Sequence, residues 1–194
     1  MNPNIKITET KLLSDNWYKL NKVTYEYRKA NGEWETQERE AYDRGNGATI
    51  LLYHAEKKTI ILTRQFRMPT YVNGNEDGMM IEACAGLLDE NNAEDCIKKE
   101  TEEETGYKVS KVQKIFEAYM SPGSVTEIVH FFIAEYAEDM KVSEGGGLEE
   151  EQENIEVLEM DFEVAYGMIA SGEIRDGKTI MLLQYAKLEG LFKN

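Results

Sequence analysis

Long hydrophobic runs are absent from this 194-residue sequence. The apolar runs extend over only a few residues, whereas a membrane-spanning helix needs about 20, so we expect no transmembrane segment. The first residues, MNPNIKITETKLL, also lack the basic and then apolar profile of a secretory signal. Apolar content of 41% nevertheless indicates a globular protein whose length suits a single domain.

Basic residues are also scarce. Lys and Arg number 22 against 37 Asp and Glu, which gives a net charge of −15. Such a surface repels nucleic acids and anionic membranes, so we expect neither as a partner. It also repels phosphorylated metabolites, and a site for one would need local cations.

Cysteine and histidine occur twice each. Cys84 and Cys96 stand in apolar settings without metal-binding spacing, which suits small core residues in a reducing cytoplasm. His54 and His130 have no Ser–His or Cys–His spacing that would indicate a covalent nucleophile.

Alternating and β-branched runs predict a strand-rich chain with a central helix and helices near its end. The expected strands are 5–13, 17–28, 34–42, 48–53, 59–64, 79–85, 109–119, 127–136 and 155–160. The expected helices are 93–105, 161–170 and 178–188. This order predicts an α/β fold in which a mixed β-sheet lies between helical layers.

Residues 1–45 form a β-rich arm in this interpretation, and 46–194 form the main domain. Asn31-Gly32 predicts a tight hairpin turn in the arm. The arm carries many aromatic residues but is too thin to form a core. We therefore expect the rest of the chain or a second protomer to cover it, which predicts a homodimer.

The segment 93–105 carries the main chemical signal. On a helical wheel its carboxylates share an arc with its apolar residues; the arc consists of Ala93, Cys96, Ile97, Glu100, Glu103 and Glu104. Burying adjacent unpaired carboxylates is costly, and a divalent cation removes that cost. The alternative is an ordinary solvated acidic face.

Gly86 and the run Lys99-Glu100-x-x-Glu103-Glu104-x-Gly106-Tyr107 resemble the Nudix box, G-x5-E-x7-R-E-U-x-E-E-x-G-U. Lys99 replaces the arginine, Thr101 stands at the apolar position, and the first half is one residue short, so the first glutamate, near Glu90, has no clear match. Pro122 and the segments 42–53, 64–67, 72–78, 118–127 and 172–179 extend the resemblance over essentially the whole chain. They resemble Nudix enzymes of the ADP-ribose pyrophosphatase branch, and within it those that split GDP-mannose.

The resemblance implies an α/β/α Nudix sandwich and Mg²⁺-dependent hydrolysis of a nucleoside diphosphate sugar, with GDP-mannose giving GMP and mannose 1-phosphate. Mg²⁺ would neutralise the pyrophosphate and activate water. The implied metal ligands are Ala85, Glu100, Glu104 and Glu153. The implied catalytic residues are Glu103 and Glu151. The implied substrate-binding residues are Trp17, Glu38, Arg39, Glu40, Arg67, Ala85, Gly86, Leu87, Glu104, Glu127 and Lys178.

Other interpretations remain open at several positions. The acids of the loop GGGLEEEQEN, which we interpret as a mobile lid on a glycine hinge, could form a plain charged surface. Trp17 could be a core aromatic, and Arg67 could form only a surface salt bridge. The substrate could be ADP-ribose. Because the box is shortened, the chain could also be a catalytically silent module that binds a nucleotide.

Overall fold

The computed structural model describes residues 2–88 and 92–192. Their contacts divide the chain into two compact units. The first unit comprises Met1–Asn46 and Tyr119–Ile128, and the second comprises Gly47–Ala118 and Val129–Asn194. None of the helices in the described residues combines the length and apolar content that crossing a membrane requires.

The first unit is built on an antiparallel sheet of β1 (Ile5–Asp15), β2 (Lys19–Arg28) and β3 (Trp34–Asp43). The predicted hairpin turn is confirmed, because β2 pairs with β3 across it and Gly32 has a φ of 88°. The predicted start of a strand at Trp17 is wrong. Trp17 lies in the turn between β1 and β2.

This first sheet has no core of its own. No side chain in residues 2–46 is buried. Large apolar side chains are instead exposed on it: Ile7, Leu12, Leu13, Trp17, Tyr27, Trp34 and Tyr42. A three-stranded sheet without a covered apolar face is marginally stable in water. This agrees with the sequence analysis, which predicted that the arm is too thin to form a core.

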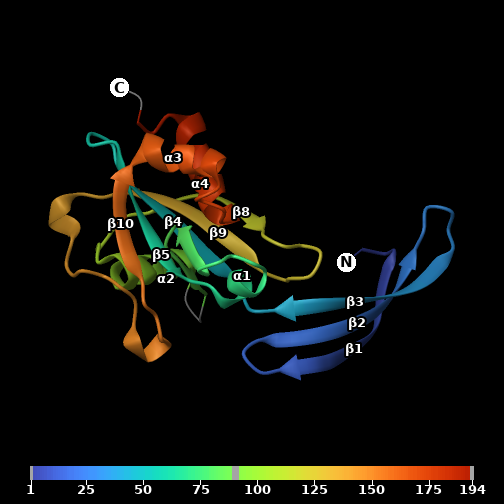
Figure 1. Cartoon of the computed structure of the whole chain (residues 1–194). Coiled ribbons are helices and arrows are strands. Elements are labelled where there is room, and N and C mark those ends of the chain that lie inside the picture. Colours follow the sequence, from blue (N-terminus) through green and yellow to red (C-terminus); the bar gives the residue numbers. More distant parts are fainter. Residues whose placement is uncertain (1, 89–91, 193–194) are drawn as a thin grey trace. The chain divides into compact units, whose positions relative to one another are not determined.

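The second unit contains a mixed sheet (Figure 1). Its strands are β4 (Gly47–His54), β5 (Thr59–Phe66), β6 (Met79–Glu82), β7 (Ala85–Leu87), β8 (Gln113–Tyr119), β9 (Ile128–Glu135) and β10 (Glu156–Asp161). The strand order is β10-β5-β4-β9-β8, with β6 on β5 and β7 on β4. The pairing of β4 with β9 is parallel, whereas β5 pairs antiparallel with β4, β6 and β10.

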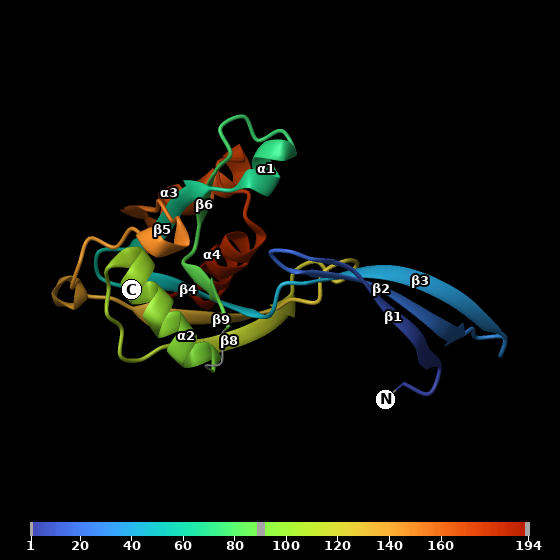
Figure 2. The same ribbon diagram turned by 90° about the horizontal axis from the view of Figure 1, so that it is seen from below.

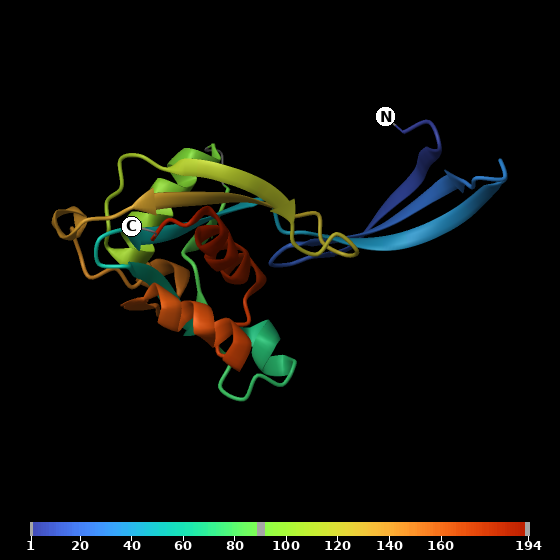
Figure 3. The same ribbon diagram turned by 90° about the horizontal axis from the view of Figure 1, so that it is seen from above.

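Helices cover both faces of this sheet. They are α2 (Ala93–Glu100), α3 (Phe162–Ser171) and α4 (Gly177–Glu189), whereas the short α1 (Met68–Val72) after β5 has no buried residue. Figure 2 shows α2 in front of the sheet, and Figure 3 shows α4 in front of it from the opposite side. Ile50 and Leu52 of β4 pack with Ile97 of α2, while Leu182 of α4 is buried on the other face. The predicted α/β/α arrangement is confirmed.

The strand predicted over 79–85 is two strands with different partners. β6 pairs with β5, whereas Ala85 and Gly86 pair with Thr49 and Ala48 of β4. Gly86, the first residue of the box pattern, therefore belongs with Ala85 to the β7 ladder. Helix α1 was not predicted, although Pro69 in its first turn is a helix-start signal.

Candidate active site

The acidic helix changes geometry halfway along. Asn92 caps α2, its Oδ1 accepting hydrogen bonds from the amides of Glu94 and Asp95 at 3.0 Å. After Glu100 the chain continues as one π-helical turn, Thr101–Thr105, and stops at Gly106 in the left-handed conformation. The predicted end is confirmed, but the π turn was not predicted.

Two threonine hydroxyls donate hydrogen bonds to backbone carbonyls in and just before the π turn. Thr101 Oγ1 donates to the Ile97 carbonyl at 2.6 Å, and Thr105 Oγ1 donates to the Thr101 carbonyl at 2.5 Å. Such back-bonding distorts a helix, and π turns are frequent at functional sites. Glu104, between the two threonines, is buried with 2% of its surface exposed.

Glu104 is in an unfavourable electrostatic environment. Burial and, after it, the charges of Glu100 and Glu153 raise the pKa of its carboxyl to about 8, while hydrogen bonds with Cys84 and the Ala85 amide act in the opposite direction. Its Oε2 accepts from the Ala85 amide at 3.3 Å. A group under this repulsion gains most from a nearby positive charge.

Glu100 lies against the β7 strand. A Cβ added to Gly86 would overlap the Glu100 carboxyl group, so a side chain at this position would displace it. Gly86 is therefore needed for close approach rather than for a turn. The Leu87 carbonyl accepts a hydrogen bond from the Cys96 thiol at 3.1 Å, which joins the end of β7 to α2.

We call α2 and the π turn together the box helix. The glycine-rich loop, with the sequence GGGLEEEQEN, packs against the end of this helix. The amides of Gly146 and Gly147 donate to the carbonyls of Glu104 and Glu103 at 2.9 and 3.1 Å. Gly145 has a φ of 70°, and a Cβ there would lie 2.5 Å from the Glu104 carbonyl oxygen. The glycines thus have a packing role that the hinge interpretation did not include.

Glu153 belongs to the same loop, and a backbone amide of the loop holds its carboxylate. Its Oε2 accepts from the Leu148 amide at 3.0 Å, and its charge contributes to the raised pKa of Glu104. Glu151 ends a 3₁₀ turn, Glu149–Glu151, but its side chain is outside the described part of the structure. The region of Glu90, near the place of the first box glutamate, is also outside it.

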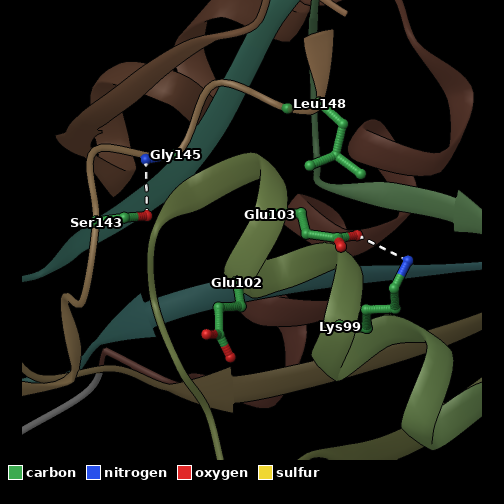
Figure 4. Close-up of a pocket in the computed structure, with 7 residues that line it drawn as sticks. Lys99, Glu102, Glu103, Ser143, Gly145 and Leu148 are labelled. Atoms are coloured by element: carbon green, nitrogen blue, oxygen red, sulfur yellow. Dashed lines mark hydrogen bonds and ion pairs between the residues drawn. The ribbon is translucent and has the colours of Figure 1, made fainter. Parts of the chain in front are cut away.

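A hollow of about 480 Å³ lies between the box helix and this loop (Figure 4). Lys99, Glu102 and Glu103 line it from the helix. Ser143 and Leu148 are among the lining residues of the loop. Glu103, a predicted catalytic residue, points toward Lys99 and pairs with it at 3.1 Å. Lys99 stands where the box pattern has arginine.

The two predicted phosphate-binding cations meet at an acid that the sequence interpretation missed. Arg67 donates from Nε and Nη2 to the two carboxylate oxygens of Glu82 at 3.0 and 2.8 Å. Lys178 Nζ lies 2.9 Å from Glu82 Oε2 and 3.1 Å from Asp176. The available signal was a single acid within the apolar run of residues 79–85.

Trp17 lies in the first unit with 82% of its surface exposed, so its alternative as a core aromatic is wrong for this chain. Glu38 accepts from Lys22 Nζ at 2.9 Å. The backbone carbonyl of Glu38 accepts from Arg39 at 2.7 Å. Glu40 lies opposite Lys22 in the β2–β3 register.

Glu127 is buried in the first unit, just before β9. Its Oε1 lies 3.6 Å from Arg44 Nε, and the Arg44 guanidinium lies over the Tyr18 ring at 5.5 Å. The sequence interpretation did not single out Arg44 or Tyr18. Arg44 therefore contacts both the predicted sugar-binding carboxylate and Tyr18, whose ring packs edge-on against Trp17.

The residues of the second unit fit a divalent cation by their chemistry. Glu100, Glu104 and Glu153 offer oxygen ligands, and the charges of Glu100 and Glu153 add to burial in raising the pKa of Glu104. Among the described side chains, no three acids, histidines or cysteines are already grouped closely enough to hold a metal ion. Metal binding would therefore have to draw the carboxylates together.

Sequence comparison identifies the class of protein. The NUDIX domain profile matches residues 43–183. The chain therefore belongs to the Nudix family and is a Nudix hydrolase. Members of this family generally use divalent metal ions, which agrees with the chemistry of the acids around Glu104.

More specific matches cover the whole chain. The profile of the GDP-mannose pyrophosphatase NudK N-terminal domain matches residues 4–42. The chain is 58% identical to the GDP-mannose pyrophosphatase of Yersinia enterocolitica over 100% of both chains. It is 58% identical to that of Salmonella arizonae, over 98% of this chain and 99% of the relative. It is 56% identical to that of Klebsiella pneumoniae, over 98% and 96%.

Proposed function

We propose that this chain hydrolyses GDP-mannose to GMP and mannose 1-phosphate. The observation that carries the chemistry is the buried Glu104, whose carboxyl is repelled by Glu100 and Glu153 and contacts the Ala85 amide. The substrate comes from relatives that are more than half identical over their full length.

The metal in this proposal is Mg²⁺, and its ligands are the Ala85 carbonyl, Glu100, Glu104 and Glu153. Bound Mg²⁺ supplies charge neutralisation at the diphosphate and activation of water. Glu104 and Glu153 are oriented before the ion arrives, by the Ala85 and Leu148 amides respectively. Glu100 is oriented by its close approach to Gly86.

The remaining residues of the second unit bind substrate and move the proton. Water attacks one phosphorus, the P–O bond of the anhydride breaks, and Glu151 takes the proton of the attacking water. Glu103, paired with Lys99, supports this chemistry from the box helix. Arg67 and Lys178 bind the phosphates, while Gly86 and Leu87 line the path of the substrate beside Ala85.

In this proposal the contacts to the base and the sugar come from the first unit, most of which coincides with the predicted arm of residues 1–45. Trp17 stacks on guanine, Glu38, Arg39 and Glu40 contact the nucleoside, and Glu127 binds the sugar. The domain organisation is then an arm of 1–45 and a catalytic domain of 46–194.

We also propose a homodimer, supported by the uncovered apolar surface of residues 2–46. The compartment in this proposal is the cytoplasm, and it is supported by two buried free thiols, Cys84 and Cys96. Thiol titration of the unfolded protein tests this proposal. A protein from an oxidising compartment would show fewer than two free thiols.

A panel of nucleoside diphosphate sugars tests the proposed function. Purified protein with Mg²⁺ should turn over GDP-mannose faster than ADP-ribose, and chromatography should show GMP and mannose 1-phosphate. Glu104→Gln is the inactive control. A preference for ADP-ribose would overturn the substrate and keep the enzyme class.

A further inference from the structure

Glu82 is a buried carboxylate that the reaction as proposed does not use. It ends β6, and its side chain is 5% exposed. Burial alone would raise the pKa of its carboxyl, but Lys178 and Arg67 lower that pKa to about 2. Glu82 is therefore ionised at any pH at which the enzyme works.

The two cations come from different parts of the fold, and both pair with Glu82. Arg67 follows β5 directly and caps α1, while Lys178 lies in the first turn of α4. Both nitrogen donors of the planar Arg67 fork are aligned with the two oxygens of Glu82. Such bidentate pairing fixes the orientation of a guanidinium as well as its position.

The frame around Glu82 is rigid. The amide of Ala83, its neighbour, donates to Thr179 Oγ1 at 2.7 Å, and Thr179 Oγ1 donates to Asp176 at 2.6 Å. Asp176 also pairs with Lys178. The strand that carries Glu82 and the start of α4 are therefore joined by backbone and side-chain contacts that leave Lys178 little freedom.

Solvent access differs between the partners. The side chain of Arg67 is 40% exposed, so a dissolved anion can reach it, whereas Glu82 is nearly inaccessible. Removing two charges from water costs free energy, and their attraction does little more than offset that cost. We therefore look for the role of Glu82 in the position that it gives to the two cations.

We propose that Glu82 is a positioning residue that fixes Arg67 and Lys178 in the arrangement in which they bind the diphosphate of the substrate. The inference rests on the proposed function, in which these two cations contact the phosphates. Glu82 itself does not touch the substrate. It prevents the two cations from separating or turning away before the substrate binds.

Glu82→Gln tests this role, because the amide keeps the shape but loses the charge and one of the two acceptor oxygens. We expect the KM for GDP-mannose and the Kd for GDP, measured by calorimetry, each to rise about tenfold or more. The kcat should change far less. The matched control is Glu156→Gln, which removes an exposed partner of Arg64 at 3.4 Å and should leave KM, Kd and kcat at wild-type values.

A combined variant separates positioning from a structural ion pair. If Glu82 acts through Arg67 and Lys178, Glu82→Gln should add little to the KM of a protein that already carries Arg67→Gln and Lys178→Gln. Additive effects, or a Glu82→Gln variant with lowered thermal stability and a wild-type KM and GDP affinity, would overturn the proposal. Should the amide prevent folding, Glu82→Asp keeps the charge but withdraws the carboxylate, and it should again raise KM.

The result also distinguishes failure of this inference from failure of the proposed function. If the wild-type protein does not hydrolyse GDP-mannose, the proposed function is wrong, and GDP affinity in the Glu82 variants still tests the positioning role. If it hydrolyses GDP-mannose but the variants bind GDP as the wild type does, only the inference is wrong.

Discussion

Two buried carboxylates in the second unit have pKa values shifted in opposite directions. Burial raises the pKa of both Glu104 and Glu82. Glu104 has acids as its charged neighbours and reaches about 8, whereas Glu82 faces two cations and falls to about 2. One carboxylate is therefore suited to receive a cation, and the other already has two.

Replacing either central acid of the box helix should abolish activity without unfolding the protein. Glu104→Gln and Glu100→Gln should each lower kcat by several orders of magnitude. Stability of the metal-free protein should be unchanged or slightly higher, since one source of carboxylate repulsion is removed. Activity assays and thermal unfolding in the presence of a chelator measure both quantities. The control is Glu94→Gln on the exposed face of α2, which should remain active.

Acid unfolding should depend on Glu82. Its pKa is about 2 when folded and near 4.5 when unfolded, so the unfolded state binds more protons between these values. The stability from ionised Glu82 is complete above about pH 4.5 and is lost as pH falls toward 2. The shift corresponds to about 3 kcal/mol. Denaturant unfolding of Glu82→Gln should therefore show a shallower loss of stability over this range than the wild type, and Glu156→Gln should not.

The two loop acids should fail differently. Glu153→Gln should raise the Mg²⁺ requirement, with activity partly restored at high metal, because Glu153 is fixed beside Glu104. Glu151→Gln should lower kcat by roughly 10²–10⁴-fold with little change in KM or metal requirement, as expected for a general base. Titrating Mg²⁺ against kcat measures both effects. Rescue of Glu151→Gln alone would show that the roles are reversed.

At the scale of elements, the active site depends on backbone contact between the glycine loop and the box helix. Gly145→Ala should weaken it, because the new Cβ would press on the Glu104 carbonyl oxygen at 2.5 Å. Gly172→Ala is the matched control, with a φ of 81° and nothing within 4 Å of the new Cβ. Both should lose about 1 kcal/mol from positive φ. Only Gly145→Ala should also raise the Mg²⁺ requirement; equal behaviour of the two in metal titrations would contradict a role for the docked loop.

Patterns of period two and 3.6 were sufficient for most elements and for the buried Cys96, Ile97 and Glu104 of the acidic helix, because alternation and helical spacing are local properties. The π turn was not predictable from them, since it accompanies hydroxyl bonds of Thr101 and Thr105 that form only in the folded helix. The division of 79–85 into two strands depends on partners elsewhere in the sheet. Glu82 was missed because its cations come from two distant places, the residue between β5 and α1 and the first turn of α4.

At the scale of the whole molecule, the exposed sheet of the first unit predicts self-association. Light scattering at micromolar concentration should give the mass of a dimer. Ile7→Asp combined with Leu12→Asp places charge on exposed apolar positions of β1 and should shift the protein toward monomer. Thr10→Asp is the control on the same strand. A wild-type monomer with full activity would contradict the dimer prediction.

The strand order of the second unit also has a consequence for biosynthesis. β4 pairs with β9, and β5 pairs with β10, so early strands need partners from the last third of the chain. Strands so far apart in the sequence can pair only after a long loop has closed, and the entropy lost in closing it comes before the strand contacts form. A nascent chain that ends before Glu156 contains the complete acidic helix but cannot complete the sheet. The enzyme should therefore become active only when nearly all of it has left the ribosome.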